Sequence, residues 1–197
     1  METLIFLFVL VYNKCRQFGL LTILRGCDYM FQEALDKISY GLYIVTSRDS
    51  EKLNGQIVDA LMQTAAIPPA VSISINKNNL THELIMKSKV FGVTVLSEET
   101  PMIFIGRFGF KSGRDIDKFE GINYEIGKTG TPLVLEYAVS VFEAEVVDYV
   151  DSFTHTIFVG KIVDTKVVSD KRPMTYLYYR EVVKGKSPKN APTYKGK

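Results

Sequence analysis

A strand and a helix are predicted to meet in the stretch Ser74-Ile75-Asn76-Lys77-Asn78-Asn79-Leu80-Thr81-His82-Glu83. Residues 70–75 alternate apolar with small polar side chains, which is typical of a strand with one face in a core. The asparagines and the lysine that follow favour a turn. Thr81 is expected to cap a helix over 82–88, because its hydroxyl can accept a hydrogen bond from a free helical N–H.

The polar end of this strand has the composition of an anion site. A helix start carries unpaired N–H groups and partial positive charge, which favour a guest such as a phosphate monoester. Lys77 and the asparagine amides add further donors. In isolation, the commoner interpretation of such a stretch is a solvated turn without a ligand. The choice therefore depends on the other segments of the chain.

Composition limits the classes of protein that the chain can form. Its 197 residues suffice for one domain with a sizeable core. The 24 basic and 22 acidic residues nearly balance, so there is no strong field to attract nucleic acid or an anionic membrane, and any anion site must be local. Val, Ile, Thr and Tyr are frequent over 40–180, which favours strands. Both cysteines precede Met30 and only two histidines occur, so we expect no metal site.

The first 29 residues differ from the rest of the chain. An apolar run over 4–12 is too short to span a bilayer, and a polar break at 13–17 separates it from the next apolar residues. The leading Glu2 and the lack of a small-x-small site argue against a signal peptide. A membrane-leaning anchor, a dimer arm and an extension from an early start codon remain open. We favour the extension, because residues 30–35 begin like an independent domain with a short amphipathic helix.

Other elements follow from periodicity and from Gly and Pro. Strands are expected over 41–47, 90–96, 138–150 and 154–168, the last being either a strand pair or one long strand with a bend at Gly160. Asn54-Gly55-Gln56 is expected to form a turn that leads into residues 57–64. A second helix is expected over 98–107, with Pro101 near its first turn, where the missing N–H is not needed.

Three further segments carry candidate functional residues. Residues 108–115 combine glycines, two aromatics and two cations, so they suit either a planar ring and a phosphate or a surface loop with apolar anchors. His155 stands between two threonines at a strand start, where a structural hydrogen-bonded role competes with a chemical one. The basic tail over 181–197 carries two prolines and is expected to pack on the domain or on a partner subunit.

Taken together, these segments resemble the flavin reductase-like family of FMN-binding split barrels. The motifs that carry the likeness are Asn54-Gly55-Gln56, residues 74–82 and Thr154-His155-Thr156-Ile157-Phe158-Val159-Gly160-Lys161-Ile162-Val163. The flavin-reductase domain of high-molecular-weight rubredoxins and flavoredoxin-like proteins also share 108–114, Asp117-Lys118-Phe119-Glu120-Gly121 and Ala191-Pro192-Thr193-Tyr194. The resemblance covers about Met30 to Tyr194 and omits residues 1–29.

The resemblance implies a mainly β fold over 30–180: a six-stranded antiparallel Greek-key split barrel with a few flanking helices. It implies a cytoplasmic homodimer that holds FMN near the subunit interface, without nucleic-acid or membrane partners. FMN would accept hydride from NAD(P)H and pass electrons to free flavin or to a protein acceptor. The chain would then be an NAD(P)H-dependent flavin reductase, and it would need no acid–base pair.

The family's site residues carry over by position. Those along the isoalloxazine ring and ribityl chain would be Asn54, Gly55, Gln56, Ile57, Val58, Asp59, Ser74, Ile75 and Asn76. Those near the phosphate would be Lys77, Asn79, Thr81 and His82. The loop after the second helix would add Phe110, Lys111, Ser112 and Arg114. His155 matches a histidine that lies near the nicotinamide donor, and it is the predicted catalytic residue.

The chain departs from the family pattern in two respects. It has Gly55-Gln56-Ile57 where many members have Gly-x-Thr, and no rubredoxin-type cysteines follow the domain. Three other functions remain open: a flavoredoxin-like FMN carrier without nicotinamide activity, a purely structural dimer, and an OB-like binder of single-stranded nucleic acid. The near-neutral charge argues against the last, because such sites are basic grooves with stacking aromatics.

Overall fold

The computed structural model describes residues 33–50 and 52–194. The predicted extension over 1–29 lies outside them, and the helix expected from Met30 is described only from Glu33, with 33–35 helical. The chain divides into two compact units, Met1–Ser39 and Tyr40–Lys197. Over the described residues, no helix is long and apolar enough to cross a membrane.

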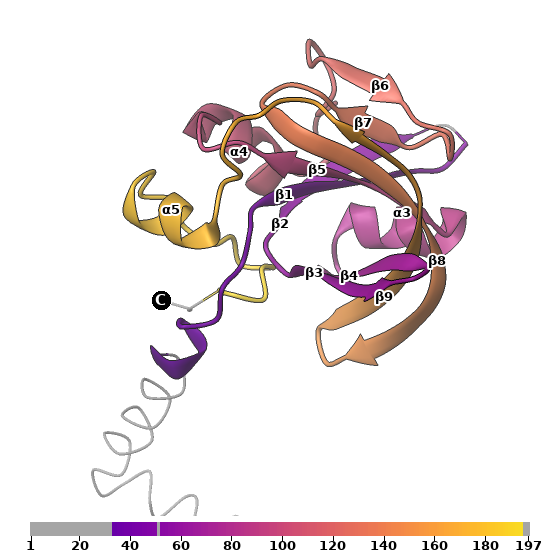
Figure 1. The fold of residues 1–197 in the computed structure, drawn as a ribbon, viewed down its shortest axis with the longest axis horizontal. Helices are drawn as coiled ribbons and strands as arrows, with labels where there is room; N and C mark the ends of the chain where they lie inside the picture. Colours follow the sequence, from indigo (N-terminus) through magenta and orange to yellow (C-terminus); the bar gives the residue numbers. More distant parts are fainter. Residues whose placement is uncertain (1–32, 51, 195–197) are drawn as a thin grey trace, which may run out of the picture. The chain divides into compact units, whose positions relative to one another are not determined.

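The second unit is built on one antiparallel sheet, whose strands lie in the order β2-β1-β5-β8-β9-β4-β3 (Figure 1). These strands are β1 (Tyr43–Arg48), β2 (Leu53–Val58), β3 (Leu61–Ala66), β4 (Pro69–Asn76), β5 (Val90–Leu96), β8 (Ala138–Ser152) and β9 (His155–Val167). A separate hairpin joins β6 (Tyr124–Ile126) and β7 (Pro132–Val134), and the helices are α3 (Leu80–Ser88), α4 (Met102–Gly109) and α5 (Tyr176–Glu181). The expected antiparallel β fold is confirmed, although the main sheet of the described chain has seven strands where six were predicted.

The sheet closes on itself because its two edge strands are neighbours in the chain. Only Asp59 and Ala60 separate β2 from β3, and three residue steps reach at most about 11 Å. The Ser74 N–H donates to the Ala60 carbonyl at 3.0 Å, which ties this connection to β4. The two edges therefore meet at this connection.

Strand β1 is buried on both faces and separates two hydrophobic clusters. Ile44 packs in a cluster with residues of α4 and α5, whereas the adjacent Val45 packs in a second cluster with Ile73 and Phe91. Because successive side chains of a strand point to opposite faces, one strand serves both cores. The predicted alternation over 70–75 is confirmed in β4, where Val71, Ile73 and Ile75 contribute to the second cluster.

Two local predictions around the opening stretch were wrong. Asn54-Gly55-Gln56 forms no turn: it lies inside β2, where Gly55 pairs with Thr46. Thr81 does not cap α3, because the chain becomes helical earlier and Asn79 is the cap residue. The Asn79 carbonyl already accepts the His82 N–H at 3.0 Å, and the Thr81 hydroxyl accepts instead from Asn54 Nδ2 at 2.8 Å.

Two further elements differ in extent from their predictions. Helix α4 begins at Met102, because Pro101 is the cap residue with extended backbone, and it continues through Phe108 and Gly109, which were expected in the loop. Strand β9 is one continuous strand that pairs with both β4 and β8. A Cβ at Gly160 would lie 2.5 Å from Cζ of Phe91, so close packing against that ring explains the glycine.

Candidate functional site

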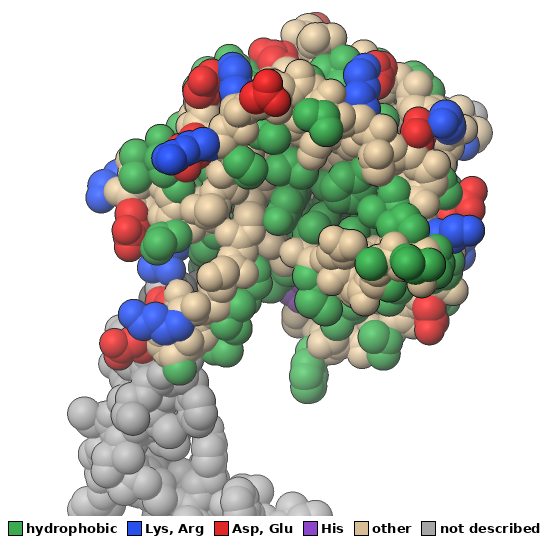
Figure 2. All heavy atoms as spheres, in the orientation of Figure 1, with side chains coloured by type: hydrophobic (Ala, Val, Ile, Leu, Met, Phe, Trp, Pro, Cys, Tyr) green, Lys and Arg blue, Asp and Glu red, His purple; other side chains and the backbone are tan. Residues whose placement is uncertain are grey.

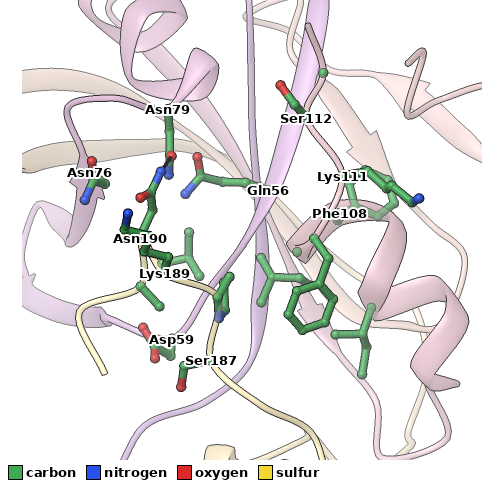
Figure 3. A pocket seen from close by; sticks show the side chains of 18 of the residues that line it. Gln56, Asp59, Asn76, Asn79, Phe108, Lys111, Ser112, Ser187, Lys189 and Asn190 are labelled. Carbon is green, nitrogen blue, oxygen red and sulfur yellow. Dashed lines mark hydrogen bonds between the residues drawn. The ribbon is translucent and has the colours of Figure 1, made fainter. Parts of the chain in front are cut away.

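A cavity of about 440 Å³ opens beside β2, within the size range of small-molecule sites. Four parts of the chain supply most of its lining: β2 with Asp59, the turn from β4 into α3, α4 with the loop after it, and the C-terminal segment 186–192. Leu42 and two tyrosines of α5, Tyr176 and Tyr179, complete the lining. Figure 3 shows Asn76, Asn79 and Asn190 on one side of it, with Phe108 and Lys111 on the other. Segments that are distant in sequence thus converge on one polar and aromatic site.

The structure brings many of the predicted site residues together around this cavity. They come from three of its four walls: Asn54, Gln56, Ile57, Val58, Asp59, Ser74, Asn76, Asn79, Phe110, Lys111, Ser112 and Arg114. Six others do not line it: Gly55, Ile75, Lys77, Thr81, His82 and His155. Among these six, Ile75 is a fully buried core residue, and Gly55 and Thr81 are hydrogen-bonded to neighbouring side chains.

Lys77 and His82 belong to a polar chain on the neighbouring surface. The Lys77 ammonium pairs with Asp151 at 2.9 Å, and Asp151 also accepts from the Thr156 hydroxyl at 2.8 Å. Because Thr156 uses its proton there, it accepts from His82 Nε2, which lies 2.9 Å away. Partial burial lowers the pKa of His82, so this imidazole is neutral at neutral pH.

His155 holds the C-terminal segment. Its Nε2 lies 3.2 Å from the Asn190 carbonyl oxygen, and its Nδ1 lies 2.9 Å from the Thr154 hydroxyl. A carbonyl only accepts, so Nε2 carries the proton and Nδ1 accepts from Thr154. A second bond, from Asn190 Nδ2 to Asn79 Oδ1 at 2.8 Å, joins the same segment to the start of α3.

Three buried acceptor atoms in the cavity wall have no hydrogen-bond partner. They are Asn54 Oδ1, Gln56 Oε1 and Asp59 Oδ1; outside the cavity, the described residues have one more such atom, Ser97 Oγ. Leaving a buried polar group unpaired costs about 1–3 kcal/mol, so such groups are rare in native proteins. Their concentration here fits a ligand that brings several N–H or O–H donors.

The cavity carries a local excess of positive charge. Its lining includes five cations, Lys111, Arg114, Lys118, Lys186 and Lys189, and one acid, Asp59. The net charge of the whole chain is only +2, so the imbalance is concentrated at this site. The Arg114 guanidinium forms an ion pair with Glu83 in the first turn of α3. The lysines are therefore the principal positive charges that would attract an anion.

Among the described residues of the lining, Asp59 is the one acidic side chain, and it is buried. It is 4% exposed, and its Oδ2 accepts a hydrogen bond from Thr193. Thr193 contacts the Tyr176 hydroxyl and Ser187, so this network anchors the C-terminal segment to the end of β2. Burial raises the pKa of Asp59, although the bond from Thr193 opposes the shift.

Sequence reasoning missed two parts of the wall. The segment 186–192 was expected only as a tail, yet it contributes seven consecutive lining residues. Lys118 was not named, although it lies within the quoted motif Asp117-Lys118-Phe119. Its buried ammonium donates to the Gly55 carbonyl at 2.8 Å and to the Phe108 carbonyl at 3.1 Å. Burial lowers the pKa of Lys118 to about 8.

Comparison with known proteins gives a consistent family. A model of the flavin reductase like domain matches residues 35–187. A ferric-chelate reductase (NAD(P)H) of Archaeoglobus fulgidus is 48% identical over 162 residues, which cover 82% of this chain and 96% of the relative. A high molecular weight rubredoxin of Moorella thermoacetica is 44% identical over 165 residues, covering 84% and 72%.

A solved structure extends the likeness to the fold. An FMN-binding protein of Thermus thermophilus superposes with a TM-score of 0.63 at 26% identity, over 70% of this chain and 78% of that one. The matched domain spans most of the described chain, including β2, the start of α3 and the loop after α4. The chain therefore belongs to the flavin reductase-like family of oxidoreductases.

Proposed function

We propose that the cavity binds FMN and that the protein is an NAD(P)H-dependent flavin reductase. The observation that carries this proposal is the coincidence of three unpaired buried acceptors with five cations around one cavity. FMN offers what these groups lack: a ring N–H, ribityl hydroxyls and a phosphate. The names of two relatives support it, since one is a ferric-chelate reductase (NAD(P)H) and another is an FMN-binding protein.

Different residues of the lining would bind the ring, the ribityl chain and the phosphate of FMN. Asn54, Gln56 and Asp59 would accept hydrogen bonds from ring and ribityl donors. The start of α3 at Asn79, with Ser112 and Lys111 opposite, would hold the phosphate, because free N–H groups and cations favour an anion. The aromatic Phe108 would supply apolar contact for the ring.

When bound, FMN supplies the hydride-accepting and electron-donating chemistry, and the protein supplies binding and orientation. The C-terminal segment closes one wall through its bonds to Asp59, Asn79 and His155, which limits the access of water. His155 acts in this proposal by holding that wall, because both of its ring nitrogens are already engaged. An FMN electron carrier is the second candidate, favoured by the 44% identity to a high molecular weight rubredoxin.

Anaerobic spectroscopy of the purified protein tests these proposals. We expect uptake of FMN, weaker uptake of riboflavin because it lacks the phosphate, and bleaching of bound flavin by NADH or NADPH. Flavin that binds but stays oxidised at millimolar donor would favour the carrier. A protein that takes up no flavin would overturn both, and the nucleic-acid and purely structural alternatives would then return.

We also propose a homodimer. The projecting half of the β8–β9 hairpin exposes Val147, Tyr149, Val150 and Phe153, with Phe153 98% exposed at the tip. Figure 2 shows hydrophobic side chains gathered over this region, and such patches mark interfaces. Sedimentation equilibrium should give a mass of two chains of 22.2 kDa each. The Val150→Asp variant should give the mass of a single chain. A monomeric wild-type chain would contradict this proposal.

A cytoplasmic location stays a prediction from the family.

A further inference from the structure

Lys118 is the one cation of the cavity lining that is shielded from water. It is 4% exposed, whereas Lys111, Arg114, Lys186 and Lys189 are exposed. Solvent and salt screen the exposed charges, but a buried charge acts through a medium of much lower dielectric. The electrostatic effect of Lys118 on a guest should therefore exceed that of the other four.

The Lys118 ammonium has no carboxylate partner among the described residues. Its hydrogen bonds go to two backbone carbonyls, those of Gly55 in β2 and Phe108 in α4. An ammonium has three donors, so one remains, and Lys118 lines the cavity. An isolated buried charge is costly unless something compensates it, and a negatively charged guest would do so.

A flavin becomes such a guest when it is reduced. A hydride carries two electrons and one proton from the C–H bond of the reduced nicotinamide, so the neutral oxidised ring gains one negative charge and the nicotinamide one positive charge. We propose that the Lys118 ammonium is the buried counter-charge for the reduced flavin in this cavity, making bound flavin easier to reduce. This inference rests on the proposed FMN site.

We assign the counter-charge to Lys118 after comparing it with the other ionisable side chains nearby. Ionisable side chains on the elements packed around it are Asp59, Arg107, Lys111, Arg114, Asp115, Asp117 and Glu120. Asp117 accepts from the Phe119 N–H at 2.8 Å, and Arg107 donates to the Glu120 carbonyl. Because burial lowers the pKa of Lys118 to about 8, the ammonium predominates at neutral pH and is lost under alkaline conditions.

Lys118→Met tests the proposal, because it keeps an unbranched chain of similar length and removes the charge. We expect the variant to lose about tenfold more affinity for reduced FMN than for oxidised FMN. This loss lowers the two-electron midpoint potential of bound FMN by about 30 mV. Lys161→Met, which removes an exposed lysine of β9, should leave the potential unchanged. An unchanged potential in Lys118→Met, with flavin still bound, would overturn the proposal. Lys118 would then have only a structural role, joining β2 to α4 through its two hydrogen bonds.

A titration of the wild-type chain keeps the test decisive if the variant does not fold. With ¹³C-labelled lysine, the Lys118 side chain should titrate near 8 in the flavin-free protein. Reciprocity of coupled equilibria then requires its pKa to be about one unit higher with reduced than with oxidised FMN. Equal values would overturn the proposal. A wild-type chain that binds no flavin would overturn the proposed function and this inference together.

Discussion

The Asp59→Asn variant will be more stable than the wild-type chain at neutral pH without flavin, and it will bind FMN about tenfold more weakly. Both effects have one cause. Asp59 is 4% exposed, and its Oδ1 has no partner in the described structure. Burying an ionised carboxylate costs more than burying an amide of the same shape. Bound FMN would supply the missing donor, and the bond to the charged acceptor would be stronger than a bond to Asn.

The sign of the pH dependence follows from the raised pKa of Asp59. A folded-state pKa above the unfolded value of 3.8 means that Asp59 favours folding at low pH and that this contribution is lost as pH rises through the folded pKa. The stability gain of Asp59→Asn should therefore be about 1 kcal/mol at neutral pH and should vanish below about pH 4.

Urea unfolding across pH and FMN titration would measure the two effects. Asp170→Asn, at an exposed turn after β9, is the matched control and should change neither quantity. Equal affinity of wild type and Asp59→Asn for FMN would show that the unpaired oxygen does not face the ligand. A loss of stability at neutral pH would show instead that the bond from Thr193 outweighs the burial of the charge.

The Glu143→Gln variant will lose about 3 kcal/mol of unfolding free energy, lowering the melting temperature by about 10 °C. Glu143 is fully buried in β8, and its carboxylate accepts hydrogen bonds from the loop between β6 and β7. The donors are the Lys128 N–H, the Thr129 N–H at 2.8 Å and the Thr129 hydroxyl. An amide would present its own N–H₂ to these donors and leave buried groups unpaired.

Glu145→Gln is the control for this prediction, because Glu145 is the next same-face residue of β8 and is exposed. Thermal unfolding should show no more than about 0.5 kcal/mol of change in that control. The loop lies away from the cavity, so Glu143→Gln should keep its FMN affinity at temperatures where it is folded. Equal melting temperatures of Glu143→Gln and wild type would mean that the loop contributes little to folding.

Local patterns were sufficient for β1, β4, β5, β8 and β9, whereas most of the residues expected at the cavity came from the family resemblance. The alternation over 70–75 predicted β4 because period-two burial depends only on neighbouring residues. The turn formers after Asn76 likewise marked the strand-to-helix connection, where Asn79 meets the cavity. The family motifs added the loop over 110–114, whose residues show no periodicity that would assign them a role.

Local patterns misplaced residues wherever a partner distant in sequence decides the outcome. Gly55 was expected in a turn, because glycine commonly marks turns, but pairing with Thr46 keeps it extended in β2. Lys77 appeared among the phosphate ligands from its position in sequence, and the structure pairs it with Asp151 from β8. For His155 the local pattern left a structural role open and the family resemblance assigned it to chemistry; in the structure its contact with Asn190 holds the C-terminal segment.

The stretch from Ser74 to Glu83 shows where the division lies. Its own residues specify a strand, a turn and a helix start, because backbone preference and alternation are properties of short segments. Its surroundings come from the closed sheet, which brings Asp59, Lys118 and Asn190 to the same cavity. Lys118 reaches Gly55 across 63 positions, and Thr193 reaches Asp59 across 134. Contacts at such separations depend on how the strands pair and close, so they become visible only in the folded chain.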